Sequence, residues 1–213
     1  KAESATRSTG KALIDMLDGC QHRGPDSTGF ALYGSTEPGH LRLRFIVGEY
    51  TAADTAIDRI KDALAKYDAS LISEEIIGTN YRLTVAYTGD IKPFAYAMEH
   101  AAKVVSIGSS LEIIKDVGSA HDVDDSYNVH EYKGSHGLGH VRLATESEVK
   151  PESAHPFWAT GFGDIAIVHN GQITNYWKMR RRLEQCSFEF TTDNDSELIA
   201  VYLADKLSQE IEL

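Results

Sequence analysis

Cysteine is scarce in this chain: only Cys20 and Cys186 occur among its 213 residues. Two cysteines do not suggest a disulfide framework, and neither has Cys or His neighbours at the spacing of a zinc site. Reduced thiols are usual in the cytoplasm. We therefore expect a cytoplasmic protein whose two cysteines are buried and structural.

Long apolar runs and a surplus of positive charge are also missing. No stretch approaches the roughly 18 apolar residues that a membrane-spanning helix needs. The formal net charge is −11, which disfavours broad nucleic-acid binding, because such binding needs a basic surface. We therefore expect a protein that binds neither membranes nor nucleic acid. The basic run at 178–182 indicates either a solvated helix face or a local contact with a partner protein.

Two further ligand classes fit the sequence poorly. The glycines at 134–139 lack Gly-x-Gly-x-x-Gly spacing and precede a strand pattern, which argues against nucleotide binding. The acidic residues around Asp195 are similar to a calcium loop, but Leu198 and Ala204 stand where that loop needs Gly and Glu. We therefore expect no metal in this chain.

The order of helical and strand patterns predicts an α+β fold. Helical patterns occupy residues 9–21, 54–67, 93–102, 176–186 and 195–208. Strand patterns occupy residues 30–33, 41–47, 71–77, 81–87, 104–107, 111–114, 138–144 and 164–169. Residues 119–128 are acidic and polar, which is typical of a linker.

The middle of the chain predicts a unit of its own. From residue 40 the patterns run strand–helix–strand–strand–helix–strand, the order of a ferredoxin-like layer. We therefore expect an inserted α+β subdomain at 40–118. The main domain is then discontinuous, at 1–39 and 119–213, and we expect it to be incomplete at both ends of this sequence.

Two charged residues suit the binding of a free amino acid. Arg142, late in a strand pattern, offers the planar fork that matches a carboxylate, although a lone Arg can also form a surface ion pair. Asp195 opens a helix pattern and can hold an α-ammonium group, or simply cap the helix. A carboxylate has enough lone pairs to do both.

An oxyanion-binding bend is predicted at Asn170 and Gly171, directly after a strand pattern. The Asn side-chain amide and the Gly N–H could both face a developing negative oxygen, and glycine lets the backbone approach the substrate. The same Asn-Gly pair is also typical of a type I′ hairpin turn. Arg23 precedes the turn at Pro25-Asp26 and could position the surroundings of a nucleophile or tie down its loop.

The motifs resemble, in their order, the amide-hydrolysing domain of class II glutamine amidotransferases, the N-terminal-nucleophile type. They are His-Arg-Gly-Pro-Asp-Ser-Thr-Gly (22–29), Gly-His-Val-Arg-Leu-Ala-Thr (139–145), Ala-His-Pro (154–156), His-Asn-Gly (169–171) and Asp-Ser-Glu (195–197). The resemblance covers about residues 11–34 and 137–208. It implies a four-layer αββα fold, in which two antiparallel sheets are stacked between helix layers.

The resemblance also implies roles for individual residues. Arg142 and Asp195 would hold the carboxylate and the amine of glutamine, and Thr145 would assist at the carboxylate. Asn170 and Gly171 would form the oxyanion hole.

The family attacks glutamine with a cysteine at residue one of the mature chain, and the α-amine of that cysteine is the base. Residue one here is Lys1. Cys20 cannot easily replace the nucleophile, because it ends a helix pattern and has no free α-amine. We expect the segment with the cysteine to lie outside this sequence; the alternative is a degenerate member. Glu146 is a second departure, since some members have His there.

The implied function is that of a glutaminase subunit, which hydrolyses L-glutamine to glutamate and delivers ammonia to partner synthase subunits in a hetero-oligomer. The long segment between Gly34 and Gly137 is similar to the small subunits of glutamate-synthase-like enzymes, such as N-methylglutamate synthase. This chain would then carry no cofactor, and flavin (FMN) and iron–sulfur groups would belong to partner subunits. The alternative is a non-catalytic scaffold or amino-acid-binding subunit that lacks the N-terminal cysteine.

Overall fold

The protein's structure, a computed structural model, describes residues 8–143 and 149–209. This part is α+β, as expected, and its paired strands are antiparallel. The helices are α1 (Thr9–Asp18), α2 (Thr51–Lys66), α3 (Ile91–Ala101), α4 (Ala120–Tyr127), α5 (Tyr176–Gln185) and α6 (Asp195–Ser208). The strands are β1 (Ser27–Tyr33), β2 (His40–Ile46), β3 (Ser70–Ile77), β4 (Asn80–Ala86), β5 (Lys103–Gly108), β6 (Leu111–Val117), β7 (His136–Arg142), β8 (Phe157–Trp158) and β9 (Ala166–Ile167).

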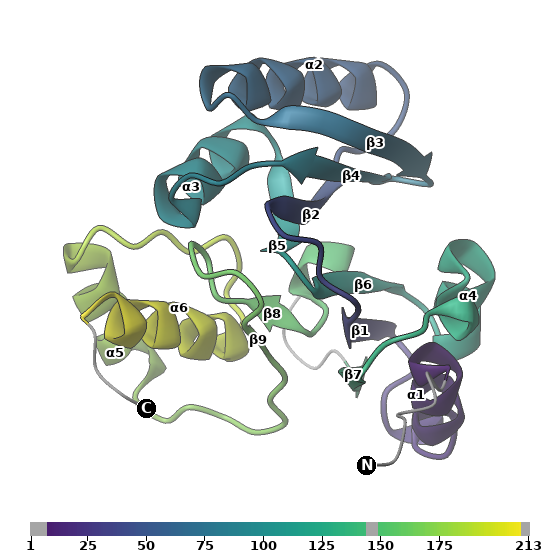
Figure 1. Ribbon diagram of the computed structural model, residues 1–213. Coiled ribbons are helices and arrows are strands. Elements are labelled where there is room, and N and C mark those ends of the chain that lie inside the picture. The colour runs from purple at the N-terminus through teal and green to yellow at the C-terminus, as the bar shows by residue number, and fades with distance from the viewer. Residues whose placement is uncertain (1–7, 144–148, 210–213) are drawn as a thin grey trace, which may run out of the picture.

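A three-stranded sheet in the order β6-β1-β7 lies at the centre of the molecule (Figure 1). Alternate residues of these strands face opposite sides. On one side, Phe30 and Leu32 of β1 pack with Ile14 of α1 and Val123 of α4. The helices α1 and α4 therefore close this face and leave the other face of the sheet for the elements that follow β7.

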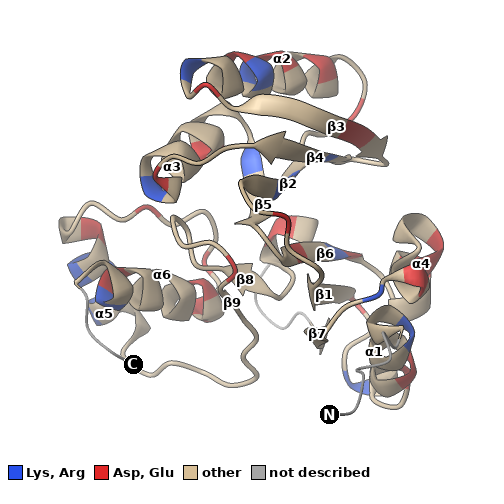
Figure 2. Cartoon of the chain, viewed as in Figure 1, with Lys and Arg blue, Asp and Glu red and all other residues tan. Residues whose placement is uncertain are grey.

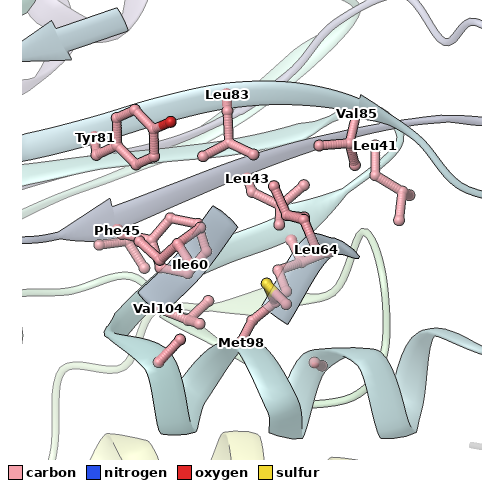
Figure 3. Close-up of a cluster of buried hydrophobic side chains, with 14 of the residues drawn as sticks. Leu41, Leu43, Phe45, Ile60, Leu64, Tyr81, Leu83, Val85, Met98 and Val104 are labelled. Atoms are coloured by element: carbon pink, nitrogen blue, oxygen red, sulfur yellow. The ribbon is translucent and has the colours of Figure 1, made fainter. Parts of the chain in front are cut away.

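A second sheet, in the order β3-β4-β2-β5, is formed by the middle of the chain. Its elements run β2-α2-β3-β4-α3-β5, the expected strand–helix–strand–strand–helix–strand order. Leu43, Phe45 and Leu83 of the sheet pack against Ile60 of α2 and Met98 of α3 (Figure 3). The helical spacing of apolar residues in α2 predicted this contact face.

Strand β6 differs from the expectation for the middle region. It follows β5 by a tight turn but pairs along its whole length with β1, from Ser27–Val117 to Tyr33–Leu111. The expected boundary at residue 118 therefore does not follow the sheets. The local sequence could not reveal this, because β6 can pair with either sheet until the long-range partner is known.

The expectation of a linker at 119–128 is wrong, because these residues form α4. Ser119 caps the helix: its hydroxyl accepts a hydrogen bond from the N–H of Asp122, and the Asp122 carboxylate accepts one from the N–H of Ser119, a capping box. Ala120, Val123 and Tyr127 lie at helical spacing and are buried. The polar residues between them face solvent, so the segment is amphipathic.

A buried ion network joins the two sheets. Arg44 of β2 and Glu112 of β6 form an ion pair in which both side chains are at most 3 % exposed. Arg82 of β4 contacts the same carboxylate, with its Nε 2.8 Å from Glu112 Oε1. Burial raises the pKa of Glu112, but Arg44 and Arg82 outweigh that effect and hold the pKa below its usual value.

The surface bears charges of both signs, and acidic residues lie on separate elements such as α2 and α4 (Figure 2). None of the helices in residues 8–143 and 149–209 combines the length and the apolar character required to cross a bilayer. Both cysteines are free thiols. Cys20 packs partly buried against the α1 side of the central sheet, but Cys186 is exposed, because it ends α5 at the surface. The expectation of burial is therefore wrong for Cys186.

Candidate active site

The C-terminal end of β7 carries Arg142 into the molecule. The side chain is 7 % exposed, and burial lowers its pKa while Asp26 counteracts this effect. The motif at 22–29 holds this strand end, because the Asp26 N–H donates to the carbonyl of Arg142 at 3.1 Å. Gly24 is required there: a Cβ at this position would lie 2.5 Å from the carbonyl carbon of Val141.

The segment containing His155 lies across the face of the central sheet opposite α1 and α4. The His155 ring stacks on His140 of β7 with ring centroids 4.2 Å apart. Gly29 of β1 pairs with His140, and a Cβ on Gly29 would lie 1.9 Å from the His155 carbonyl oxygen. Only glycine therefore allows this segment to sit so close to β1.

His155 then connects the sheet to the start of α6. Its Nε2 lies 2.6 Å from the hydroxyl oxygen of Ser196, a buried residue in the first turn of that helix. His169, which follows β9, places its Nδ1 3.2 Å from the same hydroxyl. The motifs at 139–145, 154–156, 169–171 and 195–197 are thus in contact with one another.

Asp195 is the first residue of α6, but it is not the N-cap. Asn194 caps the helix with its side chain, which accepts from the N–H of Ser196. One carboxylate oxygen of Asp195 accepts from the N–H of Ile173 at 2.8 Å, and the other lies 3.7 Å from Nδ1 of His169. Because Asn194 caps the helix, the half-buried Asp195 carboxylate does not serve as the cap, and the N–H of Ile173 holds one of its oxygens in place.

Two histidines between Arg142 and Asp195, His140 and His155, have lowered pKa values. Burial lowers the pKa of His155 to about 2, and His140, Lys115, Arg142 and His169 add to this effect. Burial also lowers the pKa of His140. The site therefore has a guanidinium at one end, a carboxylate at the other and the neutral rings of His140 and His155 between them.

Asn170 and Gly171 lie exposed between His169 and Ile173, both of which contact Asp195. They do not form a type I′ turn, because neither residue has the positive φ that such a turn needs. The strand before them is also shorter than expected, at Ala166–Ile167. The Asn-Gly pair therefore lies in a loop that bends at Gly171, between two residues that contact Asp195 at the start of α6.

Arg23 and Thr145 are the remaining predicted site residues. Arg23 is exposed at the end of a short 3-10 helix, Gln21–Arg23, so the buried partner of β7 is its neighbour Gly24. Thr145, like Glu146 and Lys1, lies outside the described residues.

Sequence reasoning missed the roles of His140, His155 and Ser196. The signal was present, since each lies inside a quoted motif. What the sequence could not show is that these side chains meet, because they come from three segments separated by loops.

A cavity of about 370 Å³ lies elsewhere, between α3 and the segment 189–197. Its described lining includes Lys103, Tyr96 and Glu197 but neither Arg142 nor Asp195. Among residues 8–143 and 149–209, no group of His, Cys, Asp or Glu side chains is arranged to hold a metal ion.

Comparison with known proteins adds independent information on this arrangement. A family model described as "Glutamine amidotransferase domain" matches residues 140–212, which include His140, His155, His169 and Asp195. A protein of Methanothermobacter thermautotrophicus named "Putative glutamine amidotransferase" is 38 % identical over 94 % of this chain and 68 % of its own length.

Two other relatives extend the comparison. The "Glutamine amidotransferase-like protein GlxB" of Rhizobium meliloti is 34 % identical over 94 % of this chain and 65 % of its own length. An amidophosphoribosyltransferase of Methanocaldococcus jannaschii is 35 % identical over 53 % of this chain and 25 % of its own length. The chain thus spans about two thirds of the length of the first two relatives. In agreement with the class II motifs of its sequence, the chain belongs to the glutamine amidotransferase family.

Proposed function

We propose that this chain is the glutamine-hydrolysing part of an amidotransferase, which converts L-glutamine to glutamate and delivers ammonia to a partner synthase subunit. The observation that carries this proposal is the connection from β7 to α6 through His140, His155 and Ser196. It links the strand end that bears Arg142 to the helix start that bears Asp195. A guanidinium and a carboxylate at the two ends match the two charges of a free amino acid.

In this proposal Arg142 binds the α-carboxylate and Asp195 binds the α-ammonium group, with Thr145 assisting at the carboxylate and Arg23 supporting the adjacent loop. The side-chain amide of glutamine then lies near Asn170 and Gly171. A cysteine thiolate from the start of the mature protein attacks the amide carbon, and the oxyanion is stabilised by the Asn170 amide and the Gly171 N–H. Ammonia leaves with the thiol proton, and water later hydrolyses the glutamyl thioester to glutamate.

We further propose the surrounding architecture. The main domain, at 1–39 and 119–213, adopts a four-layer αββα arrangement, and the α+β subdomain at 40–118 is an insertion whose last strand, β6, returns to the central sheet and pairs with β1. The partners form a cytoplasmic glutamate-synthase-like or N-methylglutamate synthase complex, in which flavin (FMN) and iron–sulfur groups belong to partner subunits and none to this chain. Support comes from the α1 and α4 packing on one face of the central sheet and the His155 segment on the other.

The test is glutamine hydrolysis by the full-length protein, followed as ammonia and glutamate release. Arg142→Ala should lower kcat/KM at least about 100-fold, mainly through KM, because a buried charge-assisted contact to the carboxylate is lost. Arg59→Ala, on the exposed face of α2, is the matched control and should behave like the parent. Equal hydrolysis by the parent and Arg142→Ala contradicts the pocket. Glutamine binding without ammonia release by the parent assigns the protein as an amino-acid-binding subunit instead.

A further inference from the structure

Lys115 is a buried lysine that the proposed chemistry does not use. It lies on β6, is 5 % exposed, and is surrounded by the central sheet and the Glu152–Pro156 segment. Burial, aided by Lys103, lowers the pKa of Lys115 to about 7. Burying an amine removes its hydration, so the Lys115 amine needs hydrogen-bond partners within the protein.

Those partners are backbone carbonyls of a single segment. Nζ donates to the carbonyl oxygens of Glu152 at 3.1 Å, Ala154 at 2.9 Å and Pro156 at 3.3 Å. Three acceptors require three N–H donors, so the ammonium form of Lys115 makes the full set. The ammonium group also lies 4.7 Å from the centre of the Phe157 ring.

The position of Lys115 on the sheet explains why this contact matters. Lys115 of β6, Gly29 of β1 and His140 of β7 are register partners and form one row across the sheet. The His155 segment crosses this row: Lys115 binds the carbonyls on either side of His155, Gly29 makes room for the His155 carbonyl, and His140 stacks on its ring. The ring of His155 then continues to Ser196 at the start of α6, and the Ser153 carbonyl accepts from the side chain of Asn194, the cap of that helix.

We propose that Lys115 is a positioning residue for the glutamine pocket, because its grip on the carbonyls of 152–156 fixes the His155 ring between His140 and Ser196. The expected effect of Lys115 on glutamine binding rests on the proposed function, whereas its expected effect on the position of His155 does not. Without the hydrogen bonds from Lys115, the segment 152–156 moves away from the sheet and the contact between His155 and Ser196 is lost. Asp195, next to Ser196, is then no longer held at a fixed distance from Arg142.

The first experiment replaces Lys115 with Met, which keeps the length of the side chain and removes its donors, and measures glutamine hydrolysis by the full-length protein. We expect KM to rise about tenfold or more while kcat changes less than about threefold, because the binding ends are displaced and not the attacking group. Ile113→Ala is the matched control. Ile113 is buried on the same strand and face, so this variant weakens β6 without touching the carbonyls.

Gly29→Ala displaces the same segment from the opposite side and provides a second variant. It should raise KM in the same way, and the double variant should be clearly less than additive with Lys115→Met, since both act on one segment. Should Lys115→Met fail to fold, Gly29→Ala carries the test. Unchanged KM in a folded Lys115→Met or Gly29→Ala protein, or an equal rise in Ile113→Ala, overturns the proposal.

The second experiment needs no substrate. Histidine NMR of this chain should show the His155 ring neutral down to at least about pH 5, and in Lys115→Met a midpoint near the ordinary value of about 6.5. Burial is the main cause that keeps this ring neutral, so loss of the Lys115 charge alone cannot produce so large a change. If His155 stays neutral in Lys115→Met, the positioning role is wrong even if glutamine is the substrate. If His155 titrates in Lys115→Met but the parent neither binds nor hydrolyses glutamine, the proposed function is wrong, whereas the role of Lys115 in positioning His155 is supported.

Discussion

At the scale of single residues, the site depends on side chains whose environment differs sharply from water. His155 is the clearest example, since it is 5 % exposed and its Nε2 forms a hydrogen bond with the buried hydroxyl of Ser196. Arg142 is equally enclosed. The sequence predicted a binding role for Arg142 and placed His155 in a motif without a role, whereas the burial of both residues and the contacts of His155 with His140 and Ser196 follow only from the fold.

Protonation of His155 should destabilise the protein at mildly acidic pH. Its folded pKa, about 2, lies below the unfolded value of about 6.5, so the unfolded chain binds the proton first as the pH falls. The contribution to stability is complete above about pH 6.5 and is lost below it, by up to about 1.4 kcal/mol per pH unit.

Chemical denaturation between pH 7.5 and pH 5, roughly the range in which histidines ionise, checks this prediction. The variant His155→Gln should flatten the pH dependence of the free energy of unfolding relative to the parent. His121→Gln removes a ring that is 61 % exposed and should keep the parent slope. An identical slope in the parent and His155→Gln would mean that the ring is not held in its neutral form.

At the scale of elements, the helices α1, α2, α3, α5 and α6 and most strands lie close to their predicted ranges. Periodicity is a local property, so it could be read from the sequence. The pairing of β6 with β1 could not, because it depends on a partner more than 70 residues away in sequence, from Tyr33 to Leu111. The helix α4 was misjudged because its polar residues outnumber its buried ones, although Ser119 and Asp122 are a capping signal.

The cap of α4 can be tested directly. Ser119→Ala should lower the free energy of unfolding by about 1 kcal/mol, because the hydroxyl acceptor for the N–H of Asp122 is lost. Thermal and urea denaturation are suitable measurements. Ser126→Ala, in the same helix, removes an exposed hydroxyl that bonds only to a carbonyl of the preceding turn and should cost less. Equal losses in the two variants would argue against the capping role.

At the scale of the whole molecule, two sheets are joined through charges rather than through apolar contacts alone. Glu112 accepts from Arg44 and Arg82, which belong to different strands of the second sheet. This network is invisible in the sequence, where the three residues are widely separated. It couples the middle region to the sheet that carries Arg142.

Breaking this network should be costly. Glu112→Gln leaves Arg44 buried without its counter-charge, so we expect a loss of about 3–5 kcal/mol in the free energy of unfolding. Glu75→Gln is the control, because Glu75 contacts Arg82 at 3.6 Å but is 57 % exposed. A loss below about 1 kcal/mol for Glu112→Gln, as for an exposed pair, would show that the network does not hold the sheets together.

The central claim is that a free amino acid binds between the end of β7 and the start of α6. A crystal structure of the full-length protein with L-glutamate tests it most directly. The account predicts the α-carboxylate about 3 Å from the Arg142 guanidinium and the α-ammonium about 3 Å from the Asp195 carboxylate. Glutamate bound elsewhere, for example in the cavity between α3 and the segment 189–197, with Arg142 and Asp195 uninvolved, would contradict it.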